Sequence, residues 1–107
     1  MLIFPVMAFR RVAGVAEVPP GQMHEIVHGE ARLALCNADG QIHAVDGTCP
    51  HAGGPLAHGA LHGTAIVCPW HAWEFDCRSG AHDFNPNLRL QTFPVELRDD
   101  GIYVDWD

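Results

Sequence analysis

The chain has 107 residues, which is enough for one domain with a modest core. Its six Arg, the absence of Lys and a formal net charge of −7 exclude the basic face that nucleic acid requires. Hydrophobic residues at 48% and charged residues at 18% exclude a disordered chain. No apolar run approaches the ~18–20 residues that cross a bilayer. The apolar start, residues 1–7, is short, contains Pro5 and has no basic leader, so we expect no signal peptide and a cytoplasmic protein.

Short β-type segments follow one another along the chain. The expected strands cover residues 8–12, 23–27, 32–36, 41–46, 64–67, 73–76, 81–83, 90–97 and 102–106. Asp39-Gly40 and Asp100-Gly101 predict hairpin turns between such runs. No segment of ten or more residues has the pattern of an amphipathic helix. The sequence therefore predicts a single all-β domain over residues 1–107, an antiparallel β-sandwich or partly closed barrel.

Two Cys-His pairs form the most informative pattern. Cys49-Pro-His51 is followed, after the sixteen residues 52–67, by Cys68-Pro-Trp-His71. Two thiolates and two imidazoles can complete the valences of two sulfide-bridged irons, and a single tetrahedral zinc accepts the same ligands. With four Cys and eight His in the chain, these two spacings arise by chance roughly one time in ten, so the spacing alone does not decide.

The residues around the two Cys-His pairs indicate the kind of site more specifically than the spacing does. Each Cys precedes a Pro, and the first pair continues into Ala-Gly-Gly-Pro55, a composition that shapes loops. Cys49-Pro-His51-Ala-Gly-Gly and Cys68-Pro-Trp-His71-Ala-Trp-Glu-Phe-Asp-Cys-Arg-Ser-Gly80 together resemble the cluster loops of Rieske [2Fe-2S] proteins. The resemblance is closest to the small ferredoxins and to the Rieske domains of ring-hydroxylating oxygenases, and it extends from about Phe9 to Trp106. It implies the Rieske fold, with a cluster-binding subdomain at about residues 46–83.

The resemblance also implies roles for the four residues. Cys49 and Cys68 would hold the inner iron of one [2Fe-2S] cluster per chain, and His51 and His71 would hold the outer iron. Rieske proteins of respiratory complexes have an extra Cys in each loop, joined as a disulfide, where this chain has Gly54 and Trp70.

Those high-potential proteins also place a Ser hydroxyl near a cluster sulfide, where this chain has Ala72 and Trp73. Fewer hydrogen bonds to sulfur make reduction harder. We therefore expect a potential near the lower end of the Rieske range of roughly −150 to +300 mV.

Several other residues near the loops have expected structural roles. Trp73 is expected to pack, whereas Trp70 either shields the cluster or lies at a docking face. Pro86 matches a third, Pro-containing loop of the family, with Phe84 beside it, although a plain structural turn is equally compatible. Cys36 is expected in the core and Cys77 as a packing residue, without a disulfide between them. Six histidines are interpreted as surface or packing residues: His24, His28, His43, His58, His62 and His82.

The predicted function is that of a one-electron carrier between a flavin-dependent reductase and a terminal oxygenase or similar acceptor. Both partners would bind transiently to a monomer, without nucleic acid or membrane, and acidity suits a partner with a basic patch. Two alternatives stay open: a small subunit of an oxidoreductase such as assimilatory nitrite reductase, and a zinc-stapled binding module. No nucleophile–base arrangement indicates an enzyme, and the length does not accommodate the catalytic domain of an oxygenase.

Overall fold

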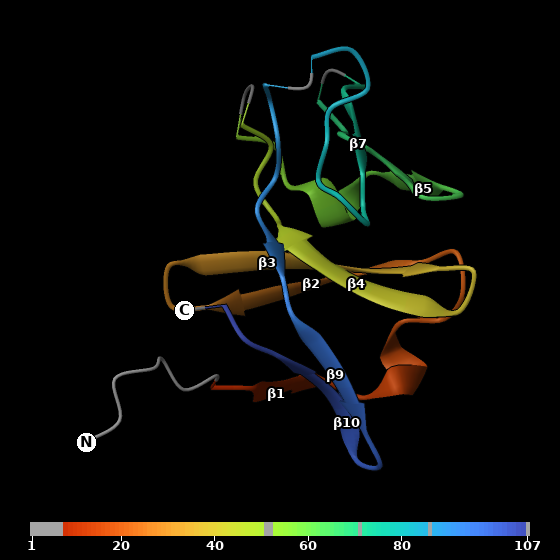
Figure 1. Ribbon diagram of the computed structural model, residues 1–107, viewed down its shortest axis with the longest axis vertical. Helices are drawn as coiled ribbons and strands as arrows, with labels where there is room; N and C mark the ends of the chain where they lie inside the picture. The colour runs from red at the N-terminus through yellow and green to blue at the C-terminus, as the bar shows by residue number, and fades with distance from the viewer. Residues whose placement is uncertain (1–7, 51–52, 71, 86, 107) are drawn as a thin grey trace.

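The computed structural model describes residues 8–50, 53–70, 72–85 and 87–106. Within these residues, ten strands form three antiparallel sheets (Figure 1), so the all-β prediction is confirmed. The strands are β1 (Arg10–Ala13), β2 (Met23–His28), β3 (Ala31–Ala38), β4 (Gln41–Asp46), β5 (Ala60–His62), β6 (Ala65–Val67), β7 (Glu74–Asp76), β8 (Thr92–Phe93), β9 (Val95–Arg98) and β10 (Gly101–Val104). The described residues also contain two short 3-10 helices, η1 (Val15–Glu17) and η2 (Leu56–His58), and no helix that is long and apolar enough to cross a membrane.

The central sheet, in the order β2-β3-β4-β8, forms the middle layer of the molecule (Figure 1). Strand β3 is buried on both faces, because successive side chains point to opposite sides of a strand. Leu33 and Leu35 enter the core shared with β10, whereas Ala34 and Cys36 enter the core shared with β6 and β7. This double burial explains the nearly continuous apolar run of β3.

The outer layers are two smaller open sheets, β1-β10-β9 and β5-β6-β7, and they do not close into a barrel in the described part of the chain. The latter lies at the end of the molecule where the predicted cluster loops emerge (Figure 1). Its first strand, β5, was not predicted, and the expected strand at 81–83 makes only isolated bridges. The expected strand at 90–97 is divided at Pro94, whose missing N–H interrupts the ladder, and its halves join different sheets.

The predicted turn at Asp39-Gly40 is confirmed between β3 and β4. Asp39 has a φ of 55° and Gly40 a φ of 87°. Two consecutive positive values are the signature of a type I′ hairpin turn, whose twist matches that of the flanking strands. The side chain of Asn37 accepts the N–H of Gly40 at 2.9 Å and donates to the Val18 carbonyl at 2.8 Å, which ties this turn to the chain ahead of β2.

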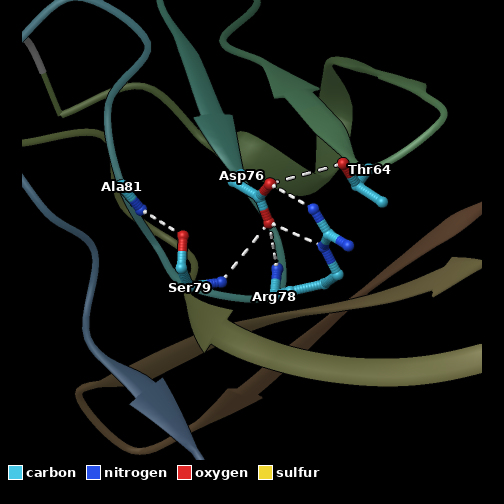
Figure 2. A network of polar contacts seen from close by, with 5 residues as sticks. All are labelled: Thr64, Asp76, Arg78, Ser79 and Ala81. Carbon is cyan, nitrogen blue, oxygen red and sulfur yellow. Dashed lines mark hydrogen bonds and ion pairs between the residues drawn. The ribbon is translucent and has the colours of Figure 1, made fainter.

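A polar turn follows β7 beside the central sheet and sends the chain back along β7 (Figure 2). The carboxylate of Asp76 accepts the backbone N–H of Arg78 at 2.7 Å and of Ser79 at 3.3 Å, and it pairs with the Arg78 guanidinium at 3.1 Å. The hydrogen bond from Arg78 is the main cause that lowers the pKa of Asp76 below its usual value. Gly80 ends the turn with a φ of 78°, and a side chain there would overlap the Leu90 carbonyl.

Replacing Asp76 with Asn tests this turn. The substitution removes the charge that Arg78 stabilises, so we expect the free energy of unfolding to fall by about 1 kcal/mol at pH 7. Because folding lowers the pKa of Asp76 from 3.8, this contribution is complete above that value and disappears as the pH falls through the folded-state pKa. Urea denaturation along a pH series should show that the difference in free energy of unfolding between the wild type and Asp76→Asn becomes smaller in acid.

The matched control is Asp99→Asn, in the exposed turn between β9 and β10. It should change the denaturation midpoint far less. A pH-independent effect of Asp76→Asn would show that the charge of Asp76 does not stabilise the turn.

Candidate metal centre

The first candidate loop begins at Cys49, shortly after β4. The Cys49 N–H donates to the Gly54 carbonyl at 2.9 Å, and the Cys49 carbonyl accepts the N–H of Gly53 at 2.8 Å. Gly53 has a φ of 77°, a conformation that glycine adopts at little cost. The Leu56 N–H donates to the Gly47 carbonyl at 2.9 Å, and this bond closes the base of the loop.

The second candidate loop begins at Cys68, directly after β6, and repeats the same construction. The Cys68 N–H donates to the Trp73 carbonyl at 2.8 Å, and the Cys68 carbonyl accepts the N–H of Ala72 at 3.0 Å. Ala72 has a φ of 59°, although it carries a side chain. In each loop the residue four positions after the Cys is therefore in the left-handed region. A left-handed alanine is strained by about 1–3 kcal/mol and persists only where its surroundings hold it.

Both candidate thiols lie in the interior. Cys49 is 1% exposed and Cys68 is 2% exposed, and neither takes part in a disulfide. They belong to the same buried cluster, together with Leu56 and Ile66. Two soft sulfur donors are thus fixed at the bases of neighbouring loops in water-poor surroundings, which suits ligands of an iron–sulfur centre.

The two loops touch at Gly54. A Cβ added there would lie 3.0 Å from the Cys68 Sγ and 3.1 Å from ring carbons of Trp70. The side-chain-free backbone of the first loop therefore packs against the thiol and the indole of the second. In the Rieske proteins of respiratory complexes these two positions would carry the cysteines of a disulfide, whereas here they make a packing contact.

The two predicted imidazole ligands, His51 and His71, lie outside the described residues. Among the described residues, no group of three or more His, Cys, Asp or Glu side chains is placed to hold a metal ion. The structure thus places the two thiols, Cys49 and Cys68, in adjoining loops. The full set of four ligands stays a prediction.

The third segment that the sequence analysis connected to the loops is organised by His82, a role that the sequence did not indicate. The ring of His82 packs against Trp73 at 4.7 Å and Phe75 at 5.3 Å between centroids. Its Nδ1 accepts the N–H groups of Phe84 at 3.2 Å and Asn85 at 3.0 Å. The packing roles expected of His82 and Trp73 are confirmed, and His82 additionally holds the turn that leads toward residue 86.

The neighbouring aromatic residues are more exposed. Phe84 meets His82 edge-on at 6.0 Å yet is 87% exposed, and Trp70 is 56% exposed. Pro86, the predicted residue of the third loop, lies outside the described residues.

Comparison with known proteins identifies the family. The model of the Rieske [2Fe-2S] domain matches residues 8–94. The chain belongs to this family. Its cofactor is the [2Fe-2S] cluster, which decides between the iron–sulfur and zinc occupants that the ligand pattern had left open.

Relatives of this Rieske chain differ in length. The ferredoxin component of biphenyl 2,3-dioxygenase from Rhodococcus jostii is 31% identical over 92% of this chain and 94% of its own length. A solved complex of reduced oxygenase and oxidized ferredoxin in carbazole 1,9a-dioxygenase contains a similar chain, with a TM-score of 0.83, 29% identity and coverage of 91% of this chain and 92% of that one. Human apoptosis-inducing factor 3 is 34% identical over 87% of this chain, which spans only 16% of that protein.

Replacing Gly54 with Ala tests the contact between the loops. The new methyl group would press on the Cys68 Sγ and the Trp70 ring, so the loops must separate slightly, at a cost of about 1–3 kcal/mol. We expect a lower thermal midpoint and fewer irons bound per chain. Gly14→Ala is the matched control, because a Cβ there meets its nearest atoms at ordinary distances of 3.6 and 3.7 Å. Full iron content and an unchanged midpoint in Gly54→Ala would show that the loops do not depend on this contact.

Proposed function

We propose that this chain carries single electrons from a flavin-dependent reductase to a terminal oxygenase. The observation that carries the proposal is the pair of matching loops, each closed on a buried cysteine, in a Rieske chain. The ferredoxin component of biphenyl 2,3-dioxygenase is matched over nearly its whole length, which supports the role of a separate carrier.

We propose Cys49, His51, Cys68 and His71 as the ligands of the cluster. When bound, a [2Fe-2S] cluster takes up and releases one electron at a time. The chain supplies the surroundings: Leu56 and Ile66 keep the thiol side of the site dry. The backbone hydrogen bonds of both cysteines hold the loops in position, so that little rearrangement accompanies electron transfer.

The residues around the second loop support a potential at the low end of the Rieske range. The N–H of Ala72 is directed to the Cys68 carbonyl, and the Trp73 carbonyl accepts from Cys68. Neither side chain offers a hydroxyl. Without that hydrogen bond to sulfide, electron density on the cluster stays high, which favours a potential toward about −150 mV.

An oxygenase as the acceptor is supported by the related ferredoxin, which occurs in a solved complex with reduced oxygenase. The net charge of −7 would accelerate encounters with partners that present a basic patch. We propose a monomer that meets the reductase and the oxygenase in turn. The cytoplasm is the proposed compartment, and four cysteines without disulfides suit its reducing conditions.

Metal analysis tests the ligand assignment. Protein purified under anaerobic conditions should be red-brown and contain about two irons and two acid-labile sulfides per chain. Cys68→Ala should lose most of the iron and the visible absorption, because one iron then lacks a thiolate. Cys36→Ala, another buried thiol of the same core, should keep both. A colourless preparation that contains zinc would contradict the assignment.

Rapid mixing tests the electron-carrier role. Chemically reduced protein should be reoxidised by a terminal oxygenase of the type served by related ferredoxins, at a rate that rises with oxygenase concentration. Added salt should slow the reaction, because it screens the attraction between acidic and basic faces. The absorbance of the cluster reports the transfer.

Gel filtration separates this role from that of a fixed subunit. A free carrier should elute alone in the absence of its partners. Permanent co-elution with a large enzyme, together with no transfer to the oxygenase, would instead favour a subunit of an oxidoreductase such as nitrite reductase.

A further inference from the structure

Two buried thiols outside the predicted ligand set are in contact with each other. Cys36 lies on β3 of the central sheet and is 0% exposed, and Cys77 directly follows β7 and is 1% exposed. They belong to the same buried core cluster, their side chains are hydrogen bonded to one another, and both are free thiols. The contact therefore links β3 of the central sheet to the residue that follows β7.

The two thiols differ in chemistry. The hydrogen bond from Cys36 lowers the pKa of Cys77, because it stabilises the Cys77 thiolate. The same hydrogen bond, followed by burial, raises the pKa of Cys36. The cavity described next borders Cys77 and not Cys36, so Cys77 is the sulfur that a reagent meets first, and Cys36 is the partner that follows.

A cavity borders Cys77. Its volume is about 500 Å³, and its walls include Cys77, Arg78, His43 and Thr92, but not Cys36. The Nε2 of His43 is buried and has no hydrogen-bond partner among the described residues. His43 also lies directly opposite Cys36 in the pairing of β3 with β4. The cavity thus lies between His43 on the central sheet and Cys77 after β7.

We propose that Cys77 and Cys36 form a reversible dithiol–disulfide pair, oxidised by a small hydroperoxide that enters through this cavity. The Cys77 thiolate attacks one peroxide oxygen, the O–O bond breaks, and the departing oxygen leaves as water after taking a proton. Cys77 becomes a sulfenic acid. The Cys36 sulfur, after losing its proton, then attacks the Cys77 sulfur and expels hydroxide, which takes that proton and forms a second water. Two thiols lose two electrons, and one hydrogen peroxide becomes two waters.

A disulfide between Cys36 and Cys77 would also affect the metal centre, because of where the two residues lie in the chain. Both predicted thiolate ligands, Cys49 and Cys68, lie between residues 36 and 77 in the chain. A Cys36–Cys77 disulfide would therefore enclose both loops in one covalent ring and tie β7 to the central sheet. Restricting the unfolded chain in this way should slow the release of iron in denaturant.

The test is peptide mapping of the cluster-loaded protein after treatment with limiting hydrogen peroxide. Cleavage before Asp residues separates the cysteines, because Asp39, Asp46 and Asp76 divide the chain between them. Cys36 falls in a peptide ending at residue 38, Cys77 in the peptide 76–82, and both predicted ligands in the peptide 46–75. After blocking of free thiols, we expect a mass that joins the first two peptides and disappears on reduction.

Single variants test the order of the two steps. In Cys36→Ala, peroxide followed by dimedone should label Cys77, because the sulfenic acid has no partner. In Cys77→Ala, Cys36 should stay unlabelled. Treated wild-type protein should also lose iron in urea several-fold more slowly than untreated protein, and this difference should be absent in both variants. Failure to find the 36–77 linkage in treated wild-type protein, or labelling of Cys36 in Cys77→Ala, would overturn the proposal.

Discussion

The double burial of β3 is the constraint on which the remaining structure depends. A strand covered on both faces requires a second layer on each side, and β3 sends alternate side chains into two separate cores. One core holds the sheet of β1, β9 and β10, and the other holds the sheet of β5, β6 and β7. The candidate thiols lie in the second core, so the two candidate loops are positioned from the central sheet outward. Small residues such as Ala34 and Cys36 keep that side of β3 thin enough for the second core to approach.

The main hairpins, and the loops that begin at Cys49 and Cys68, could be predicted from local sequence, because each depends on a few adjacent residues. The turn at Asp39-Gly40 is an example, since both residues must adopt positive φ. Features that depend on distant partners were missed. Strand β5 exists through its pairing with β6, and nothing within its three residues predicts it. The sequence predicts only a surface or packing role for His82, and the packed rings of Trp73 and Phe75 and its bonds to Phe84 and Asn85 show that it organises a segment.

The two candidate loops also show how little of the backbone conformation can be predicted from local sequence. Their Cys-Pro-x-His and Cys-Pro-His spacings differ in sequence, yet their backbones are closed by the same pair of hydrogen bonds. Gly53 and Ala72 occupy equivalent positions in that closure, both with positive φ. A glycine in the sequence suggests a positive φ, whereas an alanine gives no such indication. The likeness of the loops therefore becomes visible only in three dimensions.

This chain differs from the respiratory branch of its family in how the two loops are connected. There the loops are joined at their tips by a disulfide, at the positions of Gly54 and Trp70. Here those positions make a packing contact, and the second pair of thiols lies at the base, between β3 and the end of β7. A link at the base can constrain both loops without touching the surface where Trp70 and Phe84 are exposed.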